Sequence, residues 1–253
     1  MTSASASAAA VLGEIASWGA YFEVDVSSGD DPPDAGGWEP IASAVAADAL
    51  RVRIDGTRAA LAGTARSPQA VPLRVAASVT HLGLLTRLLS PRIGAAALGL
   101  LLSTDVRDDR WIPGSGSGFA LAVAAPEPRA VDAWSALPHA RREAWTEAAL
   151  SGVADRVSAA IDAVERLPPQ VRDGNVVSAI HGSLAAAAWT RGGRPDRRHL
   201  ACVEDLLASA VLASRWHGRV GDASFRRASC CLIYRASDPP VPTHVCGDCI
   251  LRR

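Results

Sequence analysis

Four of the five cysteines of this 253-residue chain lie within twenty residues of one another, close to its C-terminal end. They form an adjacent pair, Cys230 and Cys231, and a Cys-x-x-Cys pair, Cys246 and Cys249. A Cys-x-x-Cys turn allows two thiolates to reach the same metal, and Gly247 supplies the backbone freedom that such a turn often requires. This spacing fits a metal site in a reducing compartment better than a disulfide framework.

The adjacent cysteines bear on which metal the tail binds. Neighbouring side chains of an extended segment point to opposite faces, so Cys230 and Cys231 reach one zinc ion at about 2.3 Å only through a local distortion. A two-iron cluster presents two metal centres and gives neighbouring thiolates more ways to bind. The spacing therefore favours a [2Fe–2S] cluster, with a structural zinc site and redox-active or unligated thiols as open alternatives. Cys202 falls in an expected helix and is interpreted as a small core residue.

The tail also resembles a known signature. Residues 225–235 (FRRASCCLIYR) and 246–251 (CGDCIL) are similar to the C-terminal signature of FhuF-type ferric-siderophore reductases, and the stretches 78–98 and 174–179 resemble members of that family as well. The resemblance implies a [2Fe–2S] cluster held by four residues, and one-electron reduction of ferric siderophores, of the hydroxamate type, in the cytoplasm. The implied ligands are Cys230, Cys231, Cys246 and Cys249.

One departure from the family concerns the spacing of the two cysteine pairs. Fourteen residues separate Cys231 from Cys246. The family usually has about ten, and closing the longer loop costs only ~0.3 kcal/mol more by the logarithmic length rule. We therefore expect the longer loop to be compatible with the cluster.

Several residues near the cysteines have two interpretations. Arg226, Arg227 and Arg235 flank the adjacent pair. They either tune the potential of the cluster and attract an anionic donor or substrate, or they only solvate the surface. His244 is interpreted as an ordinary loop histidine, because His-for-Cys ligation normally comes in pairs. We predict no catalytic residue beyond the cluster ligands.

The expected partners follow from what the sequence lacks. No flavin or nicotinamide motif is present, and the glycine-rich stretch 114–118 precedes a β-like run where a nucleotide fingerprint should open a helix. We therefore expect an external electron donor, such as a ferredoxin or a reductase, beside the ferric siderophore. Basic and acidic residues balance at 26 each, which gives no reason to expect a nucleic-acid partner. The rival functions are a zinc-stapled protein that binds a siderophore or a partner without redox activity, and a [2Fe–2S] electron carrier or sensor.

The location expected from the sequence is cytoplasmic, with no stable membrane span. The N-terminal residues include no basic group of the kind that opens a secretory signal. The most apolar window, 82–102, is interrupted by Arg87, Pro91 and Arg92. The uninterrupted part is well short of the roughly 20 apolar residues that a membrane span needs.

The hydrophobic pattern predicts an α+β fold that is mainly helical, with a small antiparallel sheet and an irregular C-terminal cluster-binding tail. We expect a body over residues 1–220 and a [2Fe–2S]-binding segment over 221–253. Pro91 is expected to end one helix or to start the next. The expected helices span 8–19, 41–50, 56–65, 69–89, 138–167, 175–190 and 196–217, and the expected strands 21–26, 98–104 and 119–124, the last two flanking a long loop.

Overall fold

The computed structural model describes residues 3–27, 37–64, 66–113, 119–124, 134–237 and 245–252. The glycine-rich stretch 114–118 and His244 lie outside these ranges. The helices are α1 (Ser3–Ala16), α2 (Ile41–Ala44), α3 (Ala47–Ala62), α4 (Leu73–Ala97), α5 (His139–Ala149), α6 (Arg156–Asp162), α7 (Pro169–Thr190) and α8 (Arg197–Ala208). The strands are β1 (Asp25–Ser27), β2 (Glu39–Pro40), β3 (Arg110–Trp111), β4 (Leu121–Ala124), β5 (Trp216–His217) and β6 (Arg226–Arg227).

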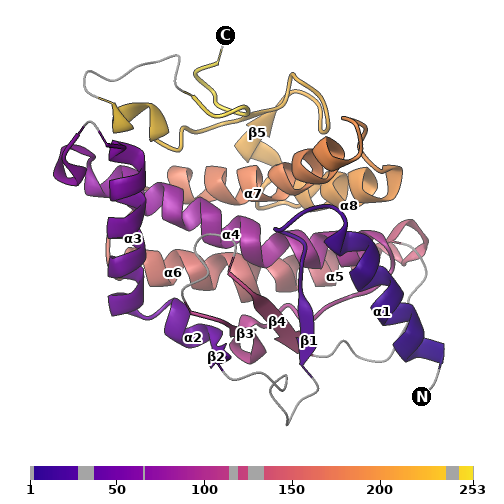
Figure 1. Cartoon of the computed structure of the whole chain (residues 1–253). Coiled ribbons are helices and arrows are strands. Elements are labelled where there is room, and N and C mark those ends of the chain that lie inside the picture. Colours follow the sequence, from indigo (N-terminus) through magenta and orange to yellow (C-terminus); the bar gives the residue numbers. More distant parts are fainter. Residues whose placement is uncertain are drawn as a thin grey trace.

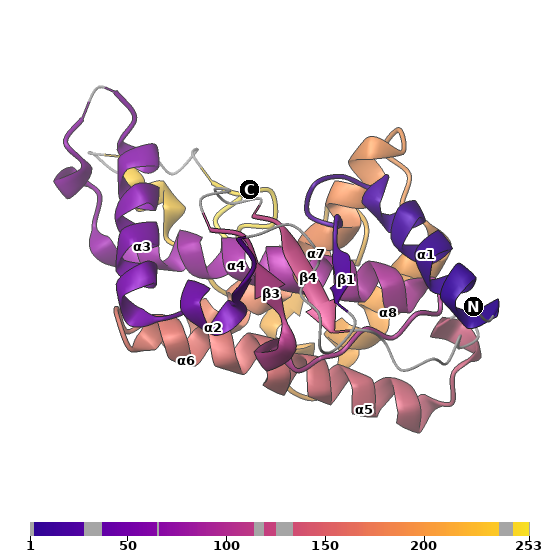
Figure 2. The same ribbon diagram turned by 60° about the horizontal axis from the view of Figure 1, so that its bottom comes forward.

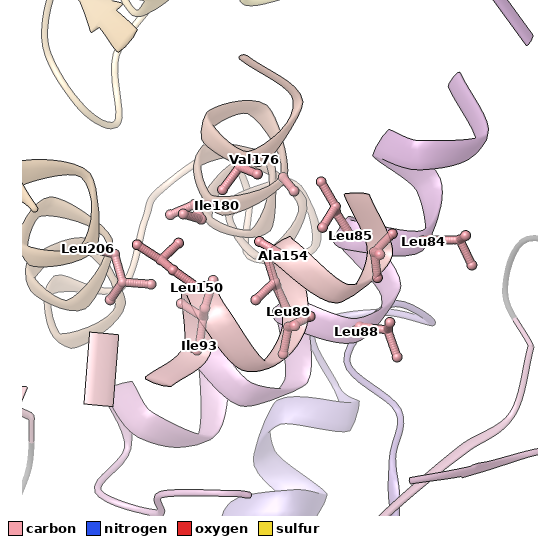
Figure 3. Close-up of a cluster of buried hydrophobic side chains, with 14 of the residues drawn as sticks. Leu84, Leu85, Leu88, Leu89, Ile93, Leu150, Ala154, Val176, Ile180 and Leu206 are labelled. Carbon is pink, nitrogen blue, oxygen red and sulfur yellow. The ribbon is translucent and has the colours of Figure 1, made fainter. Parts of the chain in front are cut away.

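Helix α4 forms the centre of the molecule and packs against α7, α3 and α8. Every residue from Arg87 to Ala97 is buried, so that other elements cover this half of the helix on all sides. The covering residues come from α7, from α8 and from a π-helical turn, Leu150–Asp155, that joins α5 to α6. Figure 3 shows these side chains meeting in one core, with Leu85, Leu89 and Ile93 of α4 facing Leu150 and Ile180.

The larger sheet has the strand order β1-β4-β3-β2. The mainly helical α+β prediction is confirmed, but the sheet is mixed rather than antiparallel, because β1 runs parallel to β4 with Asp25 opposite Ala122. Residues 98–104 do not form the predicted strand; Gly99 adopts a positive φ of 90° and turns the chain out of α4. The strand that pairs with β4 is instead β3, within the segment predicted to be a loop.

Two buried arginines on α4 attach the sheet to the helices. Arg87 is 1% exposed and donates to the carbonyls of Phe119 (2.8 Å), Tyr21 (3.2 Å) and Glu23 (2.6 Å). Arg92 donates to both carboxylate oxygens of Asp109 at 2.7 Å, with both side chains fully buried. A buried guanidinium is tolerated when its N–H groups are bonded, so each arginine fixes the strand ends and loops that supply its acceptors.

Helix boundaries differ from the prediction where tertiary packing overrides local signals. α4 continues through Pro91, and the Arg92 guanidinium donates to the carbonyl of Leu88 (2.8 Å) in the turn before it. α3 is one helix across Gly56, α7 begins at Pro169, and α8 ends at Ala208, earlier than predicted. No helix in the described ranges is both long and apolar enough to cross a membrane.

The sheet and the C-terminal tail lie on opposite sides of the central helices. Figure 1 shows the tail, in yellow, above α7 and α4, with β1 to β4 below them. Figure 2, in which the molecule is turned, shows the sheet in front and the tail behind. The cysteines therefore lie on a helical face that the sheet does not cover.

Replacement of Arg87 should expose how much the sheet depends on this buried cation. Arg87→Met leaves three carbonyls without their donor, and we expect a loss of about 3 kcal/mol or more in the free energy of unfolding. Arg51→Met is the control, because Arg51 is 57% exposed and paired only with Asp48, and should cost less than about 1 kcal/mol. Urea unfolding of both variants is the measurement. Equal losses would contradict an anchoring role for Arg87.

Candidate metal centre

The tail is held to the helices at its start by an aromatic stack. Phe225 is 1% exposed and belongs to the main hydrophobic core. Its ring stacks on His181 of α7 with centroids 3.7 Å apart, and on Trp216 at 5.4 Å. Strand β6, which follows Phe225, pairs antiparallel with β5. The chain therefore approaches the first cysteine pair from a fixed point on α7.

A second anchor lies just after Cys231. Ala236, in the short 3-10 helix Ile233–Ala236, packs with Leu232 against residues of α3 and of α4, forming a small core of its own. The Arg66 guanidinium also donates to the carbonyl of Ala236. Leu232 has a φ of 71°, a left-handed conformation that costs a residue with a Cβ roughly 1–2 kcal/mol. The turn after the cysteine pair is thus strained and is held by the packing on both sides of it.

The four tail cysteines come together as two pairs, each with one member from each segment. The Cys230 and Cys249 sulfurs are 4.0 Å apart, and the Cys231 and Cys246 sulfurs are 3.6 Å apart. Cys231 and Cys249 are buried, whereas Cys230 and Cys246 are partly exposed. The four sulfurs that the sequence predicts to be ligands therefore lie near one another, while their role as ligands and the identity of a bound group stay predictions.

Backbone N–H groups point at the cysteine sulfurs. The N–H of Leu232 donates to Cys230 Sγ (3.2 Å), and that of Leu251 to Cys249 Sγ (3.4 Å). Hydrogen bonds from the Cys230 and Cys246 thiols lower the pKa of Cys231. A backbone hydrogen bond from Ile233 lowers this pKa further. Donors aimed at sulfur stabilise thiolates and the anionic clusters that thiolates hold.

Arg227 is a fully buried cation beside the cysteines. Its Nη2 contacts Cys246 Sγ and lies 3.6 Å from Asp248 Oδ1. Burial by itself lowers the pKa of the guanidinium, but Cys231, Asp248 and Cys246 together raise it above its usual value. Within the described ranges, Arg227 Nε is buried with no hydrogen-bond partner. The guanidinium therefore keeps one N–H donor without a partner among the described residues.

A buried polar network continues from Arg227 into the helices. Arg227 Nη1 donates to Asn175 Oδ1 of α7 (3.2 Å), and Asn175 Nδ2 donates to the Ser78 carbonyl of α4 (3.0 Å). Asn175 Nδ2 also lies 3.2 Å from His81 Nδ1, and His81 Nε2 lies 3.0 Å from Ser158 Oγ. The network ties the guanidinium beside the cysteines to three helices and fixes its position.

Gly174 of α7 allows the tail to approach this closely. A Cβ at Gly174 would lie 2.1 Å from Ser229 Oγ and 3.5 Å from Cδ of Arg227. Ser229 Oγ donates to the carbonyl of Gln170, one helical turn earlier. The missing side chain thus makes room for the residue that directly precedes the cysteine pair.

The sulfur separations would allow one pair of cysteines on each of two metals. In the described part of the chain, no group of three or more His, Cys, Asp or Glu side chains is already arranged to hold a metal ion. Two thiolates on one tetrahedral ion, with bonds of about 2.3 Å, lie roughly 3.8 Å apart. The sulfurs of the Cys230–Cys249 pair and of the Cys231–Cys246 pair are both near that separation. The two pairs adjoin each other through a contact between Cys230 and Cys231. Two adjoining pairs of thiolates, with sulfur-directed donors and a buried cation, match the needs of a [2Fe–2S] cluster.

The remaining sequence candidates are spread around the site. Cys202 is buried in α8, in the main core, where burial raises the pKa of its thiol. Arg226 and Arg235 are not part of the buried network; Arg226 is partly exposed and Arg235 is exposed. Sequence reasoning missed the roles of Asn175, His81 and Gly174, although all three fall within the stretches that carried the family resemblance.

Comparison with known proteins adds no identification. No protein-family model matches the chain, and no curated protein matches it. The resemblance to ferric-siderophore reductases therefore stays a prediction.

The close approach at Gly174 has a matched control in the same helix. Gly182 has nothing within 4 Å of an added Cβ, so Gly182→Ala should stabilise the protein by about 1 kcal/mol through helix propensity. Gly174→Ala should not be stabilised in this way. Its free energy of unfolding should fall by about 1 kcal/mol, because Ser229 must give up its hydrogen bond to the carbonyl of Gln170. In a Ser229→Ala background the penalty should disappear. Equal stabilisation by both glycine replacements in thermal unfolding would contradict the docking of the tail on α7.

Proposed function

We propose that this chain is an iron–sulfur ferric-siderophore reductase, which transfers one electron to Fe(III) held by a siderophore and so releases Fe(II). The observation that carries the proposal is the convergence of the Cys230–Cys249 and Cys231–Cys246 pairs beside the buried Arg227. A [2Fe–2S] cluster, when bound, supplies the one-electron chemistry that protein side chains lack. The proposal includes a cytoplasmic location, which the family resemblance implies.

The residues of the chain have defined tasks in this proposal. Cys230, Cys231, Cys246 and Cys249 would hold the cluster. The N–H groups of Leu232 and Leu251 stabilise the added negative charge. Arg227 does the same from inside, and Asn175 keeps it in place. Together these donors make reduction of the site easier.

The exposure of the site supports transfer to an external acceptor. Cys230 and Cys246 are partly exposed, and a cavity of about 420 Å³ borders Cys246, with Arg66, Ile233 and Val245 among its lining residues. The substrate iron needs no protein ligand in this reaction. Hard oxygen ligands hold Fe(III) far better than Fe(II), so that reduction alone loosens the chelate. No general acid or base is required.

Ligation by the tail is tested with two cysteine variants. After anaerobic reconstitution, the wild type should contain two irons and two sulfides per chain, in keeping with a [2Fe–2S] cluster. Cys231→Ser should lose most of both, since it removes the most buried member of one pair. Cys202→Ala should keep full iron and sulfide, because Cys202 lies in the core of α8. A Cys231→Ser chain with full cluster content, or a wild type with one zinc per chain and no iron, would contradict the assignment.

Reductase activity is tested by a single turnover. The reconstituted chain is reduced, freed of excess reductant and mixed anaerobically with a ferric trihydroxamate and a chromogenic Fe(II) chelator. We expect one Fe(II) to appear for each cluster that is reoxidised, because one electron reduces one iron. A cluster that stays reduced in the presence of the ferric chelate would identify the protein as a carrier or sensor.

A further inference from the structure

Positive charge is concentrated in the tail, although the chain as a whole is neutral. Residues 215–253 contain seven arginines and three aspartates, a formal net charge of +4. Residues 1–214 contain nineteen arginines and twenty-three carboxylates, a net charge of −4. The C-terminal segment that carries the cysteines is therefore basic, whereas the rest of the chain is acidic.

Three arginines of the tail, two exposed and one partly exposed, have no carboxylate partner among the described residues. In the described ranges, no Asp or Glu oxygen lies within ion-pair distance of Arg226, Arg235 or Arg252. Arg226 donates to the carbonyls of Ala223 and Phe225, and Arg252 donates to the carbonyl of Gly247 (3.0 Å). Bonds to neutral carbonyls hold the side chains in place without cancelling their charges.

Two exposed aliphatic residues lie within this basic surface. Ile250 and Leu251 are 45% and 44% exposed and directly follow Cys249. The backbone N–H of Arg227 donates to the carbonyl of Asp248 (3.0 Å), which places strand β6 beside the Cys-x-x-Cys turn. Arg226 and Arg252 therefore lie near the two aliphatic side chains. We call this surface, made of Arg226, Ile250, Leu251 and Arg252, the tail face.

We propose that the tail face is the docking surface for an acidic electron-donor protein. The inference rests on the function proposed above and names the kind of partner that serves it. Unpaired arginines attract an acidic surface over a distance comparable to the Debye length, roughly 8–10 Å. The aliphatic pair supplies a small apolar contact once the proteins meet. A partner seated there lies beside the Cys246–Cys249 turn, in which Cys249 is buried and Cys246 is partly exposed.

The form of the surface favours a protein over a small anion. The two arginines of the tail face stand on separate elements, on β6 and at the end of the tail, rather than around one concave site. A small anionic chelate would be held by converging donors. Charges that stand apart instead suit a protein partner, whose approach they steer without holding it tightly.

The test measures how fast the reconstituted full chain is reduced. The donor is a chemically reduced acidic [2Fe–2S] ferredoxin, mixed by stopped flow at low and at high ionic strength. The double variant Arg226→Gln/Arg252→Gln is compared with Arg51→Gln/Arg107→Gln, which removes two exposed arginines elsewhere. Photoreduced deazariboflavin, a neutral small reductant, provides a second electron source that should not depend on docking.

We expect ferredoxin to reduce the wild type about tenfold more slowly at high salt than at low salt. At low salt, the tail-face variant should be reduced about tenfold more slowly than the wild type. The control variant should stay within about twofold of the wild type, and deazariboflavin should reduce all three chains at equal rates. A rate that is independent of salt, or an equal loss in both double variants, overturns the docking surface while leaving the reductase intact. A chain that never acquires a cluster overturns the reductase itself, and the tail face with it.

Discussion

Three fully buried arginines organise this protein. Arg87, Arg92 and Arg227 are each at most 1% exposed, and a buried guanidinium is stable only where acceptors surround it. Arg87 and Arg92 take most of their acceptors from the segments that precede the β-strands in the chain. Arg227 reaches from the tail into the helices and ends on Asn175. Buried arginines thus hold the sheet region on one side of the helical core and the C-terminal tail on the opposite side.

The third arginine differs from the other two in what balances its charge. Arg92 has a carboxylate bound through both oxygens, and Arg87 has three carbonyls. Arg227 has one carboxylate at 3.6 Å, a cysteine sulfur, and an Nε without a partner in the described part of the chain. A group that brings more negative charge to the cysteines would complete its surroundings. An all-thiolate cluster has that property, whereas four protonated thiols do not.

Much of the fold could be predicted from the sequence because it follows from local patterns. The apolar spacing of α4, α5 and α7 identified helices, and the cysteine spacing located the site. The sheet was harder, since its short strands are joined across long sequence distances by Arg87 and Arg92, which in the sequence only interrupt an apolar window. Asn175 and Gly174 were hidden for the same reason. Their roles depend on what packs against α7. That is the tail, which lies more than 50 residues further along the chain, and no pattern within α7 predicts the contact.

The same limit applies to the chemistry. The spacing of the cysteines in the sequence identified the four candidate ligands. It could not show how the sulfurs pair, which N–H groups point at them or where Arg227 lies, because these depend on how the tail folds. The sequence left a zinc site as an open alternative because it does not show how the four sulfurs are arranged in space. The proposal of two metal ions rather than one rests on the arrangement of the cysteines in two adjoining pairs.

The most direct test of this account is the Mössbauer spectrum of the full chain reconstituted anaerobically with ⁵⁷Fe and sulfide, recorded before and after one-electron reduction. The account predicts two ferric sites whose spins cancel in the oxidised protein. After reduction it predicts one ferric and one ferrous site, with an EPR signal from a single unpaired electron. Iron that remains mononuclear or adventitious, in a chain that binds one zinc tightly, would contradict the two-metal interpretation of the four cysteines.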